Sequence, residues 1–491
     1  MGNFSLIQVP WTSASEGNYA AVYRAFTSFP PLGLMSLAAS LEKAGHAVDL
    51  IDLEVEPQSF EDLCARIKNF SPGMIGLTAT TPVYPVAASY ARRLKERFGL
   101  PIVVGGAHVT ALREEALSPD MDFAVFNEGE ATLVELAREL EGRRAYAGIK
   151  GLVWREGSSV RVNQPRPFLE NLDSLPFPSR GKISPSRYSF EVPGLGVVPV
   201  FLAELSRGCP FNCVFCGEGV YNGRKLRSRS PARVVEDILD AKAKFGAAHF
   251  GLVASTLTAD RGSIEGLCRE LIRRKAGVTF EGQTRANLVD GPLLALLREA
   301  GLVRLNFGLE SVDPNALLLM RKGVTPEEVR TALRLCRGLG ISTTVASMLG
   351  NPGDTRETVM ATARFVRATP EIRYSPFAIA VPYPGTELRR MAEQGLHGLK
   401  LLSAGTGGFS RYAGGMMEVN GMGPAELARL QRRAMLVAHA SPSKILGLLR
   451  HFGAGSLLRA ATRALLGGLG RLCSAKEPAP ARPDAKSKMI Q

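Results

Sequence analysis

Three cysteines within eight residues constrain the chain more than any other feature. Cys209, Cys213 and Cys216 have the spacing C-x3-C-x2-C and follow an apolar, strand-like run over residues 197–205. A short loop that leaves a strand can aim three thiolates at one point, which suits a [4Fe–4S] cluster with one iron left without a protein ligand. A structural zinc site would need a second cysteine or histidine pair, and none lies near in the sequence. A zinc site and buried thiols without a metal remain as the less favoured alternatives.

The loop resembles the signature of the radical S-adenosylmethionine (radical SAM) superfamily. The resemblance implies that Cys209, Cys213 and Cys216 bind the cluster. It also implies that the open iron chelates the amino and carboxylate groups of S-adenosylmethionine. An electron donor such as flavodoxin or ferredoxin is then an expected partner.

Composition predicts a cytoplasmic protein. The 491 residues suffice for two or three domains, and the seven cysteines show no regular pairing. The first residues lack the basic stretch and apolar run of a secretion signal. Half of the net charge of +14 comes from residues 441–491, where nine Lys and Arg face two acidic residues. Because the rest has no interleaved Lys, Arg and aromatic residues, we expect no nucleic-acid partner.

Residues 1–145 alternate strand-like and helix-like patterns. This order predicts a doubly wound, flavodoxin-like α/β domain, because parallel strands need helical crossovers. The expected strands cover residues 4–9, 47–53, 74–79, 102–104 and 123–126. The expected helices cover residues 32–43, 60–70, 86–97 and 131–140.

Candidate cofactor-binding residues lie in the loops at the carboxyl ends of these strands, where such sheets bind ligands. They are Thr78, Ala79, Thr80, Gly105, Gly106, His108, Thr110, Glu128 and Gly129. Ordinary turn chemistry is the alternative, since any flavodoxin-like domain has glycine-rich turns. Joined to the cysteine loop, segments 30–33, 105–110 and 127–130 resemble the cobalamin-binding domain that precedes many radical SAM barrels.

One segment of other cobalamin proteins is missing. The chain has no Asp-x-His-x-x-Gly, which supplies the lower axial histidine of cobalamin mutases. The resemblance therefore implies cobalamin with its own base displaced and its lower face against the Thr78 and His108 loops. We interpret His108 as a loop histidine bonded to the backbone or to the edge of the cofactor, and not as a cobalt ligand.

A connector and a second α/β domain follow. Residues 146–196 predict a β-hairpin and a proline-rich linker, and residues 197–395 repeat a strand, loop and helix pattern. The resemblance implies the partial (β/α)6 barrel of the superfamily. The expected strands cover residues 200–205, 248–253, 279–284, 302–307, 342–348 and 374–380. The expected helices cover residues 232–244, 263–275, 292–300, 326–339 and 356–368.

The later strand ends carry candidate contacts to S-adenosylmethionine. By resemblance these are Arg285, Glu310, Ser311, Gly350 and Asn351, and simple turns or paired surface charges are the alternatives. Many relatives have adjacent acidic residues after the second barrel strand. Here segment 253–258 has none, and we expect Ser255 or Thr256 to serve as a neutral hydrogen-bonding substitute.

The C-terminal part departs from the barrel pattern. Residues 396–474 predict a helical region, and residues 475–491 have the composition of a disordered tail. Within it, the basic helix expected over 444–472 either caps the barrel, which we favour, or rests on an anionic membrane surface. The second alternative would place the protein at the inner face of the membrane.

The sequence therefore predicts an enzyme with a [4Fe–4S] cluster, S-adenosylmethionine and cobalamin. The expected reaction is C-methylation of an unactivated carbon in a small biosynthetic intermediate, and no catalytic side chain is assigned. A cyclase or rearranging enzyme with the same cofactors is the first alternative. A non-catalytic zinc- or cluster-bearing protein is the second.

Overall fold

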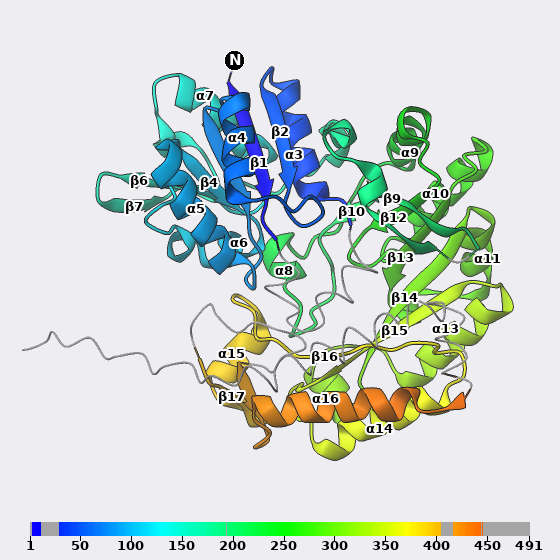
Figure 1. The fold of residues 1–491 in the computed structure, drawn as a ribbon. Helices are drawn as coiled ribbons and strands as arrows, with labels where there is room; N and C mark the ends of the chain where they lie inside the picture. The colour runs from blue at the N-terminus through cyan, green and yellow to red at the C-terminus, as the bar shows by residue number, and fades with distance from the viewer. Residues whose placement is uncertain (1, 11–28, 193, 404–415, 443, 445–491) are drawn as a thin grey trace, which may run out of the picture. The chain divides into compact units, whose positions relative to one another are not determined.

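Alternating strands and helices at the start of the chain build a parallel sheet with the order β2-β1-β3-β4-β5, which is the flavodoxin-like order (Figure 1). The computed structural model describes residues 2–10, 29–192, 194–403, 416–442 and 444. The strands are β1 (Asn3–Gln8), β2 (Ala47–Asp52), β3 (Met74–Thr78), β4 (Ile102–Gly105) and β5 (Phe123–Val125). The helices are α3 (Leu32–Lys43), α4 (Phe60–Phe70), α5 (Tyr84–Phe98), α6 (Ala107–Leu112) and α7 (Glu130–Glu141).

Two hydrophobic cores cover the two faces of this sheet. Successive side chains of a strand point to opposite faces, so Leu6 joins one core and Ile7 the other. The Leu6 core includes side chains of α3 and α7, whereas the Ile7 core includes side chains of α4 and α5. This confirms the predicted doubly wound domain.

The predicted hairpin extends the first sheet. Strands β6 (Leu152–Glu156) and β7 (Ser159–Val162) pair antiparallel, and β6 also pairs antiparallel with β5. The sequence pattern assigns this hairpin to a connector. The alternating pattern of its two strands predicts a hairpin but does not predict that the hairpin pairs with β5 at the edge of the N-terminal sheet. The N-terminal sheet therefore has seven strands.

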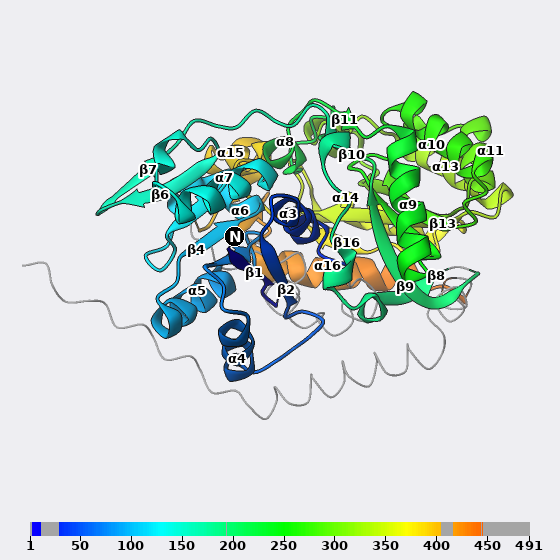
Figure 2. The same ribbon diagram turned by 90° about the horizontal axis from the view of Figure 1, so that it is seen from above.

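The second sheet holds six parallel strands in the order β16-β15-β14-β13-β12-β9, with β8 antiparallel at the β9 edge. The strands are β8 (Ser189–Val192), β9 (Gly196–Glu204), β12 (His249–Val253), β13 (Thr279–Thr284), β14 (Leu302–Glu310), β15 (Ser342–Leu349) and β16 (Phe377–Ile379). The large helices are α9 (Pro231–Phe245), α10 (Arg261–Arg273), α11 (Gly291–Glu299), α13 (Pro326–Gly338) and α14 (Arg356–Ala368). Figure 2 shows α9, α10, α11 and α13 gathered on the side away from the blue N-terminal strands. The arrangement is the predicted open (β/α)6 barrel.

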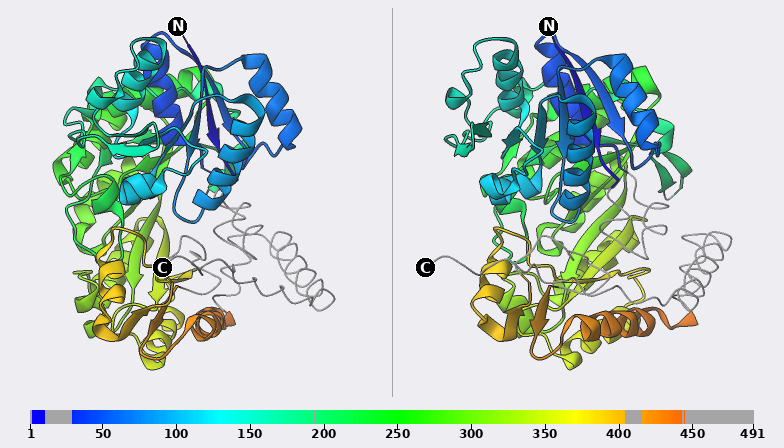
Figure 3. Two further views of the ribbon diagram at one scale, coloured as in Figure 1. Left: turned by 90° about the vertical axis from the view of Figure 1, so that its left-hand side faces the viewer. Right: turned by 60° about the vertical axis from the view of Figure 1, so that its left-hand side comes forward.

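Shorter helices and strand pairs lie between or after these elements. They are α8 (Glu218–Tyr221), α12 (Pro314–Leu319), α15 (Glu387–Glu393), and the pairs β10 (Ser206–Arg207) with β11 (Arg227–Ser228) and β17 (Leu399–Leu401) with β18 (Met417–Val419). The long helix α16 (Pro424–His439) follows them. Helix α16 lies alongside α14 (Figures 1 and 3).

The basic helix predicted over 444–472 and the tail 475–491 lie outside the described residues, except Lys444. Within the described ranges, no helix is long and apolar enough to cross a membrane.

Candidate functional site

The cysteine loop leaves the first barrel strand and is held by backbone hydrogen bonds to three other segments. Gly208 opens it with a φ of +83°, and a Cβ there would clash with the Lys225 carbonyl oxygen, so the turn requires glycine. Cys209 N–H donates to the Gly223 carbonyl at 3.2 Å, and Val214 N–H donates to the Met320 carbonyl at 3.1 Å. The Val214 carbonyl accepts from Leu388 N–H at 2.8 Å. The loop is therefore braced in one conformation.

The three thiols of this loop are free and close together. Cys209 and Cys213 are buried, and Cys216 is half-buried. Burial raises the pKa of Cys216, and the neighbouring Cys213 and Cys209 raise it further. No three His, Cys, Asp or Glu side chains of the described ranges gather around a point as they would around one metal ion. A structural zinc ion takes four protein ligands, whereas a cluster with one open iron takes three thiolates, so this set of donors fits a cluster better than zinc.

Two polar side chains touch the cysteine sulfurs. Thr256 Oγ1 lies 3.8 Å from Cys209 Sγ, and Arg285 Nη1 lies 3.5 Å from Cys213 Sγ. Thr256 follows the second barrel strand, where the expected acidic residues are missing, and Arg285 follows the third. The barrel thus brings two of the predicted residues onto the cysteine loop.

A cavity of about 500 Å³ extends from the N-terminal sheet to the mouth of the barrel. Its N-terminal wall includes Leu6, Gly33, Leu37, Thr78, Gly105 and Gly106, and its barrel wall includes Ser206, Arg207, Ala254, Ser255 and Gln283. Carboxyl ends of parallel strands contribute to both walls, through Thr78 and Gly105 on one side and Ala254 and Gln283 on the other, and ligands of α/β domains bind at such ends. Helix α3 adds Gly33 and Leu37 to the N-terminal wall. A Cβ added at Gly33 would meet no atom within 4 Å, so the missing side chain leaves open space.

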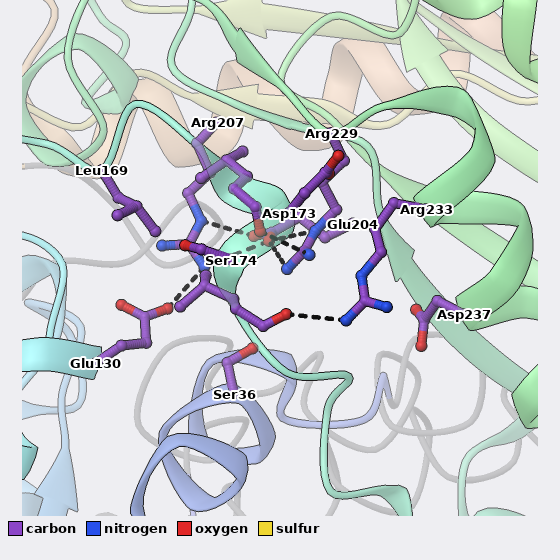
Figure 4. A network of polar contacts seen from close by, with 12 residues as sticks. Ser36, Glu130, Leu169, Asp173, Ser174, Glu204, Arg207, Arg229, Arg233 and Asp237 are labelled. Carbon is purple, nitrogen blue, oxygen red and sulfur yellow. Dashed lines mark hydrogen bonds and ion pairs between the residues drawn. The ribbon is translucent and has the colours of Figure 1, made fainter. Parts of the chain in front are cut away.

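A set of six buried or half-buried charged residues, which we call the Arg207 clasp, joins the two walls. Its members are Glu128, Glu130, Glu204, Arg207, Arg227 and Arg229. Figure 4 shows Arg207 with Glu130 on one side and Glu204 on the other. The ion-pair distances from Arg207 are 2.7 Å to Glu130, 2.8 Å to Glu204 and 3.2 Å to Glu128. Arg227 pairs with Glu128 at 2.6 Å, and Arg229 pairs with Glu204 at 3.0 Å.

The charges of the clasp compensate one another. Burial alone would raise the pKa of Glu204, but Arg207 and Arg229 outweigh it and hold that pKa below its usual value. Burial alone would lower the pKa of Arg207, but Glu130 and Glu204 outweigh it and raise that pKa. Glu204 and Arg207 are therefore both charged at neutral pH.

Comparison with known proteins identifies both halves. Residues 203–366 match the family model of the radical SAM superfamily, and residues 21–137 match that of the B12 binding domain. An uncharacterized methyltransferase of Pyrococcus horikoshii is 33% identical over 365 residues, which make up 74% of this chain and 78% of that protein. The chain belongs to the cobalamin-dependent radical SAM family. Its cofactors are a [4Fe–4S] cluster, S-adenosylmethionine and cobalamin.

Two further relatives differ in reaction. An anaerobic magnesium-protoporphyrin IX monomethyl ester cyclase of Synechocystis sp. is 30% identical over 315 residues, 63% of this chain and 62% of that protein. The solved structure of the radical S-adenosylmethionine methyltransferase TsrM from Kitasatospora setae, with cobalamin and [4Fe–4S] cluster bound, matches with a TM-score of 0.70 at 20% identity. That match covers 97% of this chain and 100% of the other and shows the same fold.

The residues present fit these cofactors of the cobalamin-dependent radical SAM family. Three free thiols on one braced loop are the donor set of a cluster with an open iron. The cavity has an apolar wall at Leu6 and Leu37 and bare glycine backbone at Gly33 and Gly106, which suits a large, flat ligand.

The structure divides the residues predicted to bind cobalamin into two groups. Five line the cavity, namely Thr78, Gly105, Gly106, Glu128 and Gly129. Four are not among its lining residues, namely Ala79, Thr80, His108 and Thr110. The predicted Gly105–Thr110 loop was wrong in extent, because Gly106, with a φ of +107°, makes the turn and helix α6 begins at Ala107.

His108 belongs to the hydrophobic interior. Its Nδ1 lies 3.3 Å from Thr81 Oγ1, and its ring stacks on Tyr84 with the centroids 4.1 Å apart. Burial lowers its pKa to about 4, so the ring is neutral at pH 7. Its Nε2 has no hydrogen-bond partner among the described residues.

The candidates after the later barrel strands bond to neighbouring residues of the barrel. Glu310 pairs with Lys322 at 2.8 Å, and the buried Ser311 Oγ accepts from Asp313 N–H at 3.1 Å. Asn351 Nδ2 donates to Asp354 and to the Met348 carbonyl at 3.1 Å and 3.2 Å. Gly350 precedes it with a φ of +80°. These four candidates are not among the residues that line the cavity.

Sequence reasoning missed the clasp. Glu128 was predicted as a cofactor contact and Arg207 lies next to the cysteine loop, but no local pattern pairs the two. The only signal was the unusual number of charges beside apolar strands, with Glu204 and Arg207 flanking a buried segment.

Proposed function

We propose that this enzyme transfers a methyl group to an unactivated carbon of a small biosynthetic intermediate. The observation that carries the proposal is the cavity lined by both halves of the chain. A cobalamin in its N-terminal part and a substrate at the barrel mouth would share one continuous cavity. The methyltransferase relatives support the same reaction class.

In this proposal Cys209, Cys213 and Cys216 hold the cluster. Thr78, Gly105 and Gly106 offer the cobalamin a close backbone and hydroxyl surface. When bound, the cluster with S-adenosylmethionine supplies a 5′-deoxyadenosyl radical, and the cobalamin supplies the methyl group. The Arg207 clasp keeps the two walls of the cavity in fixed register, and the apolar wall excludes water from a reactive site.

Product analysis tests the proposal. Anaerobically reconstituted enzyme with S-adenosylmethionine, hydroxocobalamin, a reductant and a host extract should release both 5′-deoxyadenosine and S-adenosylhomocysteine, because a second S-adenosylmethionine is then the source of the methyl group. Mass spectrometry should show a product heavier than its substrate by one CH2. Formation of 5′-deoxyadenosine without S-adenosylhomocysteine in the presence of the converted substrate would contradict methyl transfer.

Oxidative cyclisation or rearrangement is the second candidate. The 30% identity to the Synechocystis cyclase favours it, although the chain spans only 62% of that protein. The same experiment separates the two, because a cyclase gives no S-adenosylhomocysteine and its product is not heavier by CH2.

A further inference from the structure

One buried arginine faces a cluster cysteine without a carboxylate to balance its charge. Arg285 is 7% exposed, and its Nη1 lies 3.5 Å from Cys213 Sγ. Its Nη2 donates to the Lys322 carbonyl oxygen, and its Cζ lies 4.0 Å from the centre of the Phe211 ring. Its Nε is buried and has no hydrogen-bond partner in the described part of the chain.

The neighbouring cation, Lys322, has a carboxylate partner, and Arg285 differs from it in this respect. Lys322 Nζ pairs with Glu310 at 2.8 Å and leaves its carbonyl oxygen to Arg285. Within the described ranges no Asp or Glu forms an ion pair with Arg285. A buried guanidinium without a carboxylate destabilises the fold unless another negative group lies next to it. The thiolate of Cys213 is the group that the structure places there.

We propose that Arg285 raises the reduction potential of the cluster through Cys213, an assignment that rests on the proposed function. A cluster held by three thiolates becomes more negative when it takes one electron from an external donor. A charge-assisted N–H···S hydrogen bond stabilises the reduced form more than the oxidised form.

The competing role is contact with the carboxylate of S-adenosylmethionine. The two roles can be distinguished experimentally. A hydrogen bond to a ligand sulfur changes the reduction potential of the cluster even when S-adenosylmethionine is absent. The Phe211 ring and the Lys322 carbonyl hold the guanidinium against the loop itself.

The test is a redox titration of the full-length, anaerobically reconstituted protein without S-adenosylmethionine. Dithionite and mediators set the potential, and electron paramagnetic resonance reports the reduced cluster. Arg285→Met removes the charge, whereas Arg285→Lys keeps it. Arg298→Met, at an exposed position of α11, is the matched control.

We expect Arg285→Met to make reduction about tenfold less favourable, which is about 59 mV for a one-electron couple. Arg285→Lys should fall between this variant and the wild type, and Arg298→Met should not differ from the wild type. An unchanged potential in Arg285→Met with full iron content would overturn the proposal. A weaker affinity for S-adenosylmethionine at unchanged potential would assign Arg285 to that carboxylate instead.

If Arg285→Met does not retain its cluster, Arg285→Gln provides the comparison with Arg285→Lys. Loss of the cluster in all three variants would mean that Arg285 holds the loop in place, and it would overturn the tuning role. A wild-type protein that binds no cluster would overturn the proposed function itself, which is a distinct result.

Discussion

Two arginines lie at the cysteine loop, the half-buried Arg207 and the buried Arg285, and their surroundings differ. Arg207 directly precedes Gly208 and pairs with three carboxylates, at 2.7, 2.8 and 3.2 Å. Arg285 reaches Cys213 and pairs with a thiol, a carbonyl oxygen and an aromatic ring. The first charge is compensated inside the protein, and the second is not.

This difference assigns Arg207 to the structural scaffold and Arg285 to the cofactor site. A compensated buried network fixes the geometry of the chain and costs much when one partner is removed. A buried charge without an oppositely charged partner destabilises the folded protein. Such groups are common at binding and catalytic sites, where a ligand supplies the opposite charge. Asp52 is an anionic counterpart, because among the described residues its buried carboxylate accepts from neutral donors, namely the Tyr188 hydroxyl at 2.9 Å, the Glu54 N–H at 3.0 Å and the Gln8 side-chain amide at 3.3 Å.

The largest effect is expected for Cys213→Ala, which removes the sulfur that Arg285 faces. The reconstituted variant should lose the visible absorbance of the cluster and all 5′-deoxyadenosine formation, since two thiolates do not hold the cluster. Spectra and product analysis measure both losses. Cys268→Ala, which removes a buried thiol from helix α10, should keep the cluster. Full activity of Cys213→Ala would refute the ligand assignment.

Arg207→Met tests the compensated side of the comparison. It leaves Glu130 buried without its cation, so we expect the free energy of unfolding to fall by about 3 kcal/mol. Urea denaturation of the cluster-free protein measures this. Arg269→Met breaks an exposed pair with Glu265 and should cost less than about 1 kcal/mol. Equal effects of the two variants would mean that the clasp is not a scaffold.

Asp52 extends the comparison to pH. Burial raises its pKa to about 6, whereas the unfolded chain should titrate near about 3.9. The folded protein therefore binds more protons between these values, and its free energy of unfolding should fall by about 2 to 3 kcal/mol as the pH rises from about 4 to 7. Asp52→Asn should flatten this part of the stability curve. An unchanged slope in the variant would show that Asp52 does not cause it.

The smallest effect is expected for the stability of Arg285→Met without cofactors. Losing two hydrogen bonds and the contact with Phe211 is offset by relief from burying an unpaired charge. We expect a change below about 1 kcal/mol in urea denaturation. A loss as large as that of Arg207→Met would place Arg285 in the scaffold and remove the contrast between the two arginines.

The sequence predicts what depends on local spacing. The cysteine loop, most helices and the alternation of strands and helices along the chain follow from periodicity and turn residues within a few positions of one another. The clasp joins residues 77 and 79 positions apart, and Arg285 lies 72 positions from Cys213. The clasp depends on how the two sheets pack, and the Arg285 contact depends on how the barrel strands are arranged, which no local pattern encodes. The same limit explains why His108 was expected in a loop at the cofactor and instead packs on Tyr84.

The central claim is that one chain holds a cluster on the cysteine loop and a cobalamin in the adjoining cavity. Metal analysis of the full-length protein tests it most directly, after anaerobic reconstitution with iron, sulfide and hydroxocobalamin and removal of unbound cofactor. The account predicts the four irons of a [4Fe–4S] cluster and one cobalt per chain, with no zinc. Stoichiometric zinc in place of iron, or a cluster-bearing protein that retains no cobalt, would contradict it.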